Sequence, residues 1–140
     1  MQPIHTVAAV IANENGEVLL VRKRASSTFI QPGGKTEPNE EPLSALAREL
    51  EEELGVQLDA KTTARLGEFE DVAVNEPGRM VRAQAFYCSV HGTPRPQAEI
   101  EELVWVNPAG PHHVSVAPLS AAHILPAYVA YSSKVPAGGG

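Results

Sequence analysis

The sequence predicts an α+β fold in which a mixed sheet lies between helices. The predicted elements occur in the order strand, helix, strands, helix, and the chain contains no internal repeat. Its 140 residues, of which 43% are hydrophobic and 20% charged, are enough for one ordinary core. We therefore expect one domain over residues 1–134 and a flexible Pro/Gly tail over residues 135–140.

The first predicted elements are two strands and a loop. Apolar runs over His5–Ala12 and Glu17–Arg22 flank the dipeptide Asn15-Gly16, which is a typical two-residue hairpin turn. Residues 24–32 then break the pattern with Ser and Pro and lead into Gly33-Gly34. This order predicts a β-hairpin followed by a functional loop.

A helix follows the loop and begins at Pro42. The sequence PLSALARELEEEL places leucine and alanine at helical spacing, and Gly55 follows at the position where helices commonly end. The remaining predicted elements are strands Ala64–Val74, Met80–Val90 and Leu103–Val106, a turn at residues 75–78, and a closing helix over Leu119–Tyr131.

Charge and cysteine content restrict the class of protein. The net charge of −6 gives no general attraction to nucleic acid or to an anionic membrane, so a phosphate ligand needs a local cation. Cys88 is the only cysteine and cannot form an internal disulfide. The N-terminus lacks a basic segment and a long apolar run. We expect a soluble, cytoplasmic protein without nucleic-acid or membrane partners.

Three carboxylates of the predicted helix share one face. At about 100° per residue, Glu49, Glu52 and Glu53 fall within one arc, whereas Glu51 points elsewhere. Like charges at this spacing repel one another, and acids near a helix C-terminus oppose the helix dipole. Either this is a solvated acidic face, or a divalent cation such as Mg²⁺ offsets the repulsion. The adjacent Gly33-Gly34 favours the cation.

From Gly34 the chain resembles the Nudix family. Gly34 is followed by five residues, Glu40, seven residues, Arg48-Glu49-Leu50, one residue, Glu52-Glu53, one residue and Gly55-Val56. Every defined position of the Nudix box is filled in this segment. The resemblance implies an α/β/α sandwich with a mixed sheet, and an enzyme that hydrolyses a nucleoside diphosphate linked to another group X.

The resemblance also implies the metal ligands and their supporting residues. It assigns divalent metal, Mg²⁺ with Mn²⁺ as an alternative, to the carbonyl of Gly33 and the carboxylates of Glu49, Glu52 and Glu53. Glu40 and Arg48 would support these ligands, with Arg48 orienting one glutamate.

A further glutamate outside the box is implied as a metal ligand. Glu99, six residues before Trp105, is our choice, with Glu102 as its substitute. The general base remains open among Glu49, Glu52 and Glu99.

Several residues outside the acidic helix are candidates for contact with the substrate. Basic residues 22–24 end the second predicted strand, and the resemblance favours Lys23, with Arg22, as the phosphate-binding cation. Gly34 leaves space for a diphosphate. Aromatic residues are core or base-contact candidates, namely Phe29, Phe69, Phe86 and Tyr87.

Two absences favour nucleoside triphosphates over other nucleotides. ADP-ribose hydrolases of the family tend to carry a proline soon after the box, whereas no proline follows the box here before Pro77. Dinucleotide polyphosphate hydrolases tend to carry a tyrosine in the same stretch, whereas no tyrosine occurs here before Tyr87. The base-binding asparagine of MutT-like relatives is replaced near Ser120, so base preference stays open. We predict a Mg²⁺-dependent nucleotide pyrophosphatase that gives a monophosphate and pyrophosphate, acting as monomer or homodimer. Alternatives are an ADP-ribose or nucleotide-sugar pyrophosphatase and a non-catalytic nucleotide sensor.

Overall fold

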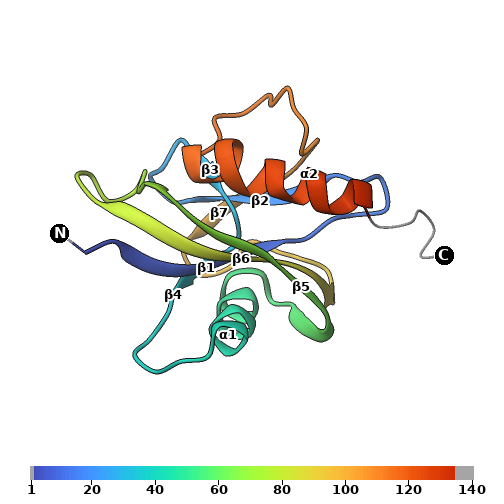
Figure 1. The fold of residues 1–140 in the computed structure, drawn as a ribbon, viewed down its shortest axis with the longest axis horizontal. Coiled ribbons are helices and arrows are strands. Elements are labelled where there is room, and N and C mark those ends of the chain that lie inside the picture. Colours follow the sequence, from blue (N-terminus) through green and yellow to red (C-terminus); the bar gives the residue numbers. More distant parts are fainter. Residues whose placement is uncertain (1, 135–140) are drawn as a thin grey trace.

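The computed structural model describes residues 2–134, and these form a mixed α and β fold with two sheets and two helical segments. The predicted Pro/Gly tail, residues 135–140, lies outside the described residues. In Figure 1 the strands occupy the middle of the molecule, α1 (Pro42–Leu54) covers one side, and α2 (Leu125–Lys134) covers the other. The predicted fold class is confirmed.

The strands divide into two sheets, where the sequence predicted one. The four-stranded sheet has the order β4-β1-β6-β5 and consists of β1 (Ile4–Val10), β4 (Gly33–Lys35), β5 (Gln57–Val72) and β6 (Met80–His91). The three-stranded sheet has the order β3-β2-β7 and consists of β2 (Val18–Lys23), β3 (Phe29–Ile30) and β7 (Ile100–Val106). Among the strands of residues 2–134, β1 and β6 are the one pair that runs in parallel.

The expected N-terminal hairpin is correct at its turn and wrong in its pairing. Gly16 donates its N–H to the Asn13 carbonyl, so the chain reverses as predicted. Beyond the Ala12–Val18 bridge, however, β1 and β2 enter different sheets. Both strands are buried on two faces, and a turn dipeptide does not specify which partner such a strand takes.

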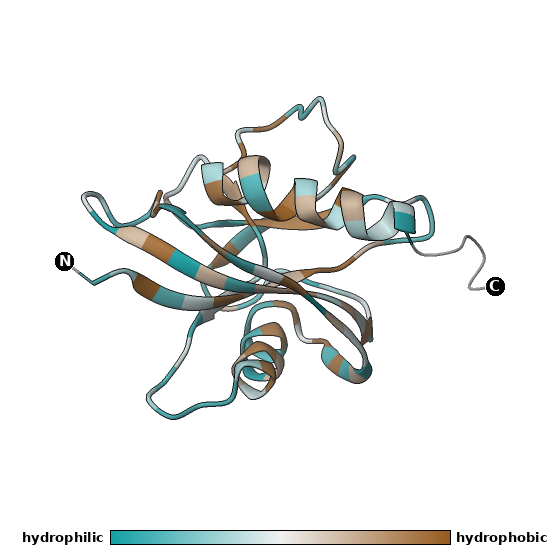
Figure 2. Cartoon of the chain, in the orientation of Figure 1, coloured by the Kyte–Doolittle hydropathy of each residue, from teal (hydrophilic) through white to brown (hydrophobic). Residues whose placement is uncertain are grey.

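The helices pack on opposite faces of the four-stranded sheet. Along β1, Val7 and Ala9 face the core beneath α1, whereas Ala8 and Val10 face the core beneath α2. This alternation follows from the two-residue period of a strand. Figure 2 shows the hydrophobic residues concentrated on the strands and helix surfaces between these layers.

Helix α1 has the predicted bounds, and its C-terminus is set by Gly55. Gly55 adopts φ 69°, a left-handed conformation, and donates its N–H to the Glu51 carbonyl. The leucines of the helix lie in the core and give it a fixed rotation, since Leu46, Leu50 and Leu54 are fully buried. That rotation directs the acidic face toward β4.

The closing helix begins with a π-helical segment, η1 (Leu119–Ile124), and continues as α2. It therefore covers the predicted span and extends slightly beyond it. No helix among residues 2–134 is long and apolar enough to cross a membrane.

Candidate active site

The centre of the acidic face is Glu53, which is 2% exposed. Its Oε1 accepts a hydrogen bond of 3.1 Å from the backbone N–H of Gly33. Burial raises the pKa of Glu53 to about 8, against the opposing effect of this hydrogen bond. The ionised form of a carboxyl group buried to this extent is unfavourable unless a cation lies beside it.

The twin glycines are required by two different contacts. A methyl group on Gly33, which has φ 146°, would overlap the Val7 carbonyl oxygen of the neighbouring strand. A methyl group on Gly34 would overlap the carboxylate of Glu49. Strand β4 can therefore approach β1 this closely only because Gly33 lacks a side chain, and the lack of a side chain at Gly34 leaves the Glu49 carboxylate its position beside β4.

Arg48 joins the loop before α1 to the acidic face. Its Nε and Nη2 donate to the two carboxylate oxygens of Glu40, at 3.0 and 2.9 Å, and its Nη1 donates to Glu49 Oε1 at 2.9 Å. A fourth bond runs from Nη2 to the Lys35 carbonyl at 3.2 Å. The fork of the guanidinium thus holds Glu49 in a defined orientation beside β4.

The pKa values of the two carboxyl groups shift in opposite directions, because Arg48 lowers both but burial outweighs it at Glu49. Hydrogen bonds from Arg48, chiefly, hold the pKa of Glu40 below its ordinary value. Burial raises the pKa of Glu49, although Arg48 opposes this shift. Arg48 therefore stabilises the ionised form of Glu40, whereas at Glu49 the same arginine offsets only part of the cost of burying the ionised form.

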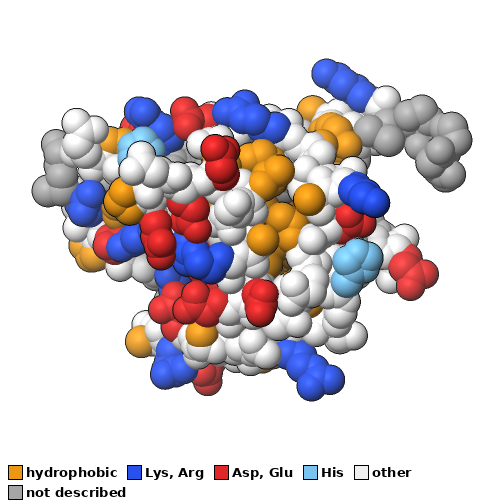
Figure 3. Space-filling model, turned by 90° about the horizontal axis from the view of Figure 1, so that it is seen from below, with side chains coloured by type: hydrophobic (Ala, Val, Ile, Leu, Met, Phe, Trp, Pro, Cys, Tyr) orange, Lys and Arg blue, Asp and Glu red, His pale blue; other side chains and the backbone are white. Residues whose placement is uncertain are grey.

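Glu52 lies on the same helix but in a different environment. It is exposed, and no hydrogen bond or ion pair of Glu52 is present among residues 2–134. Figure 3, which views the molecule from the α1 side, shows acidic and basic side chains intermingled over this face. The structure therefore brings Glu49 and Glu53 to the twin glycines and leaves Glu52 at the solvent boundary.

Lys23 and Glu99 lie in contact. Lys23 Nζ and Glu99 Oε1 are 3.1 Å apart and join β2 to the start of β7. The two neighbouring basic residues pair in the same way, Arg22 with Glu102 at 3.1 Å and Arg24 with Glu101 at 3.9 Å. The predicted phosphate-binding lysine and the predicted outer metal ligand thus form an ion pair across the three-stranded sheet.

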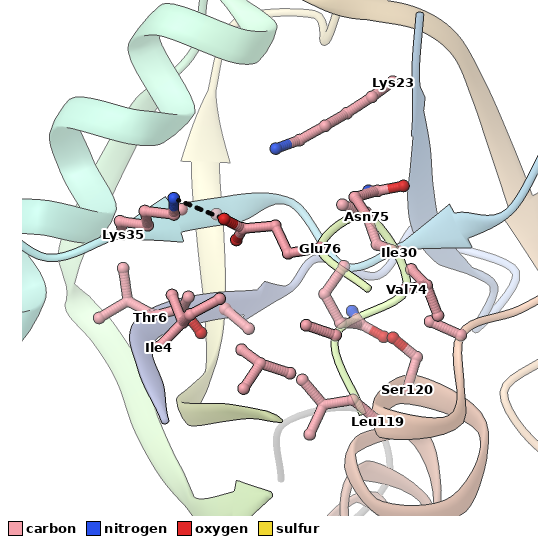
Figure 4. Close-up of a pocket in the computed structure, with 18 of the residues that line it drawn as sticks. Ile4, Thr6, Lys23, Ile30, Lys35, Val74, Asn75, Glu76, Leu119 and Ser120 are labelled. Carbon is pink, nitrogen blue, oxygen red and sulfur yellow. Dashed lines mark hydrogen bonds and ion pairs between the residues drawn. The ribbon is translucent and has the colours of Figure 1, made fainter. Parts of the chain in front are cut away.

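A cavity of about 140 Å³ lies beside β4. Gly33, Gly34 and Lys23 border it, so the acidic face and the cavity share the same strand. Figure 4 shows Ser120 of η1 pointing into it, and the ion pair between Lys35 Nζ and Glu76 Oε1, 3.2 Å long, crossing beside it.

The cavity is also lined by residues that the sequence analysis did not select as site residues. Ser120 lies in it, near the position where MutT-like relatives carry an asparagine, and Gln31, Val74 and Leu119 line it as well. They come from three separated segments, and of these only Gln31, which lies directly before Pro32-Gly33-Gly34, is close in sequence to a selected motif.

The four aromatic candidates do not line this cavity in the described part of the chain. Phe29 and Phe86 are buried in the cores. Phe69 stacks on His123 with ring centroids 6.1 Å apart, and Tyr87 stacks on Tyr128 at 5.7 Å. The geometry therefore favours a packing role for these four aromatic residues over contact with a base.

The comparisons with known proteins agree on one family. A family model described as a NUDIX domain matches residues 3–127. This chain belongs to the Nudix family. It is 34% identical to the CTP pyrophosphohydrolase of Escherichia coli (strain K12) over 143 aligned residues, which cover 98% of this chain and 99% of the relative.

Two further similarities extend the comparison. The 8-oxo-dGTP diphosphatase of Escherichia coli (strain K12) is 32% identical over 85 residues, 58% of this chain and 62% of that protein. The solution structure of the Escherichia coli ORF135 protein aligns with a TM-score of 0.76 and 32% identity, covering 98% of this chain and 96% of that one. The present Nudix chain is accordingly a hydrolase of phosphorus-containing acid anhydrides.

The Nudix box provides oxygen donors that fit a hard divalent cation. The donors beside Gly33 are carboxylate and carbonyl oxygens, which Mg²⁺ prefers, and no ion pair to Glu53 is found in residues 2–134. No group of three or more His, Cys, Asp or Glu side chains in that range is already arranged as a metal cage. Mg²⁺ does not require one, because it usually keeps several waters and binds few carboxylates together with substrate phosphates.

Proposed function

We propose that this Nudix hydrolase converts a nucleoside or deoxynucleoside triphosphate and water into the monophosphate and pyrophosphate, with Mg²⁺ as cofactor. The proposal is based on the buried carboxylate of Glu53, which accepts a hydrogen bond from the Gly33 N–H. The carboxylate of Glu49 lies nearby, beside Gly34. A single divalent cation can offset the negative charge of these carboxylates and of the substrate phosphates together. The relatives named for CTP and 8-oxo-dGTP support a triphosphate substrate.

The proposed ligands come from α1, from β4 and from the residue before β7. Glu49, Glu53 and the Gly33 carbonyl would hold the ion, Glu99 would complete the set, and the exposed Glu52 would reach the ion only through a bound water. When bound, Mg²⁺ neutralises phosphate oxygens and lowers the pKa of a water. Release of Glu99 from Lys23 would leave the lysine cation free to face the substrate phosphates.

The proton of the attacking water needs an acceptor. Among the three candidates, Glu49 is hydrogen-bonded to Arg48, and Glu99 would be engaged as a metal ligand after its release from Lys23. Glu52 is exposed and carries no such contact in the described residues. We therefore assign proton acceptance to Glu52, while Arg48 and Glu40 keep Glu49 oriented.

A substrate panel tests the proposal. Canonical and oxidised deoxynucleoside triphosphates, CTP, ADP-ribose, a nucleotide sugar and a dinucleotide polyphosphate are assayed with Mg²⁺ for formation of the nucleoside monophosphate, which is a product of every one of these hydrolyses. We expect a triphosphate to give the highest kcat/KM. If ADP-ribose or the nucleotide sugar is cleaved fastest, the triphosphate assignment is wrong, and if all compounds bind without turnover, the chain is a sensor.

The matched variants are Glu52→Gln and Glu51→Gln. Both positions are exposed and adjacent, but Glu51 points away from the shared acidic face. We expect Glu52→Gln to lower kcat by about 10²-fold or more, because general-base catalysis contributes on that order. Glu51→Gln should retain the parent rate. Equal rates for Glu52→Gln and the parent would contradict the proposed site.

A further inference from the structure

The segment before β7 is bonded to the C-terminus of the acidic helix. The Gln97 N–H donates to the Glu53 carbonyl at 3.0 Å. The Arg95 N–H donates to the Leu54 carbonyl at 3.0 Å. The last carbonyls of a helix have no partner within it, so this segment satisfies two of them in α1. The backbone that carries Glu53 is therefore joined directly to the residues that lead to Glu99.

The backbone of this segment turns at Ala98, directly before Glu99. Ala98 has φ 53°, a left-handed conformation that costs free energy in a residue with a side chain. Such a conformation persists where surrounding contacts hold it. After the turn, Glu99 Oε1 lies 3.1 Å from Lys23 Nζ of β2. The position of the Glu99 carboxylate therefore depends on the contacts that hold this turn.

Arg24, which follows β2 directly, supplies two of these contacts. Its side-chain Nη2 donates to the Ala98 carbonyl at 2.8 Å, and its backbone N–H donates to the Glu99 carbonyl at 2.8 Å. By comparison, its Nε lies 3.9 Å from Glu101 Oε2, which is a long ion pair. The Arg24 side chain is 69% exposed, so its contacts add little to the free energy of unfolding. Their main effect is on the orientation of the Ala98–Glu99 peptide.

The Glu99 carboxylate lies within electrostatic range of the acidic face. Burial is the main cause of the raised pKa of Glu53, and the negative charges of Glu49 and Glu99 add to it. The charge of Lys23 acts on the same group in the opposite direction. Because Glu99 is exposed, its side chain has room to rotate while its backbone stays bonded to Arg24.

We propose that Arg24 is a positioning residue, which fixes the Ala98–Glu99 peptide so that the Glu99 carboxylate reaches the divalent cation by rotation of its side chain alone. The inference rests on the proposed function, which makes Glu99 a metal ligand. A fixed backbone lets Glu99 exchange Lys23 for the cation without rearrangement of the segment before β7. It also reduces the conformational entropy that is lost when the carboxylate binds.

Equilibrium binding of Mn²⁺ to the substrate-free protein tests the positioning role without turnover. Electron paramagnetic resonance measures the free ion during a titration. Arg24→Met removes the side-chain bond to Ala98 and should weaken Mn²⁺ binding about five-fold, the loss that corresponds to one ordinary hydrogen bond. Arg65→Met removes an exposed arginine of β5 and should leave the affinity unchanged. Equal affinities of Arg24→Met and the parent overturn the inference.

A double-mutant cycle with Glu99 separates positioning from a general structural effect. Glu99→Gln alone should weaken Mn²⁺ binding about ten-fold. Adding Arg24→Met to Glu99→Gln should cause no further loss, because Arg24 acts through Glu99. If Arg24→Met weakens binding equally in both backgrounds, its effect does not pass through Glu99 and the inference is overturned. Arg24→Ala, which removes the same contact without an exposed methionine, should repeat the result and decides if Arg24→Met does not fold.

Steady-state kinetics provide a second readout. Arg24→Met should raise the Mg²⁺ concentration that gives half the maximal rate about five-fold, with a smaller effect on the KM for the nucleotide at saturating Mg²⁺. A raised KM with an unchanged Mg²⁺ dependence would mean that Arg24 binds the substrate instead, which overturns the positioning role.

Failure of the proposed function is distinguishable from failure of this inference. If Glu99→Gln leaves Mn²⁺ binding unchanged, Glu99 is not a ligand and the inference is overturned, although hydrolysis by the parent would still support the proposed function. If the parent hydrolyses none of the nucleotides, the enzyme assignment is refuted. A loss of Mn²⁺ affinity in Arg24→Met that requires Glu99 would still support the positioning role in that case.

Discussion

The carboxylate of Glu49 lies so close to Gly34 that a methyl group at position 34 would overlap it. A side chain at position 34 is thus excluded by Glu49 of α1, whereas a side chain at the neighbouring position 33 is excluded by the carbonyl of Val7 on β1. A side chain added to this part of β4 would therefore change the position of a proposed metal ligand.

Gly34→Ala should displace Glu49 and lower turnover with little effect on the fold. We expect kcat/KM to fall by about 10²-fold, the loss typical of a displacement of about 1 Å at a reacting centre. Gly78→Ala is the comparison, because its added methyl group meets no atom, although φ 81° strains the backbone there. That variant should lose stability and keep its activity. Steady-state kinetics and thermal denaturation of both variants distinguish the two effects.

Stability of the metal-free protein should depend on pH through Glu53. Its pKa rises from 4.5 to about 8 on folding, so between these values the folded state holds a proton that the unfolded state has lost. Stability is therefore highest below pH 4.5 with respect to this group and falls as pH rises toward 8, by at most about 5 kcal/mol. Chemical denaturation with a chelator across this range measures the slope.

Two controls accompany the pH series. Glu53→Gln, which cannot ionise, should remove most of this slope, and Glu51→Gln at an exposed position should leave it unchanged. Saturating Mg²⁺ should also reduce the slope, because a cation stabilises the ionised form. A parent protein whose stability is independent of pH between 5 and 8 would contradict the raised pKa.

Arg48→Lys should lower activity even though the charge is kept. A lysine cannot donate in a planar fork to both oxygens of Glu40 and still reach Glu49. We expect a loss of kcat or Mg²⁺ affinity of about 10-fold to 100-fold, as for other residues that orient metal ligands. Arg82→Lys, which alters the exposed pair with Glu70, should have no effect on kinetics.

Glu99→Gln tests whether this residue leaves Lys23 to bind metal. If Glu99 is a ligand, the substitution should weaken the activation by Mg²⁺ about 10-fold, the lower range for loss of support at a metal site. Glu101→Gln, which removes only the long and exposed pair with Arg24, should not. Identical Mg²⁺ dependence of the two variants would assign Glu99 to the ion pair alone. The measurement is the initial rate as a function of Mg²⁺ concentration.

Features set by neighbouring residues were predictable from the sequence. The helix Pro42–Leu54 and its end at Gly55 were predicted correctly, because leucine spacing and the terminal glycine are local signals. The place of the chain reversal around Asn15 and Gly16 was also predicted correctly, although the Gly16 N–H bonds to the Asn13 carbonyl and the central residues of the turn are Glu14 and Asn15. By contrast, strand Gln57–Val72 begins earlier than predicted, because its first half carries few apolar residues and is recognisable only by its pairing with β6.

The sequence by itself determined that an acidic helix follows twin glycines in a Nudix box, because these residues are close along the chain. The tertiary structure alone decided which residues meet across long separations. It joined Lys23 to Glu99, brought Ser120 to the strand that carries Gly33, and left the Gln31 oxygen without a partner in residues 2–134. Such contacts depend on sheet order and on burial, and neither is encoded in the spacing of a local motif.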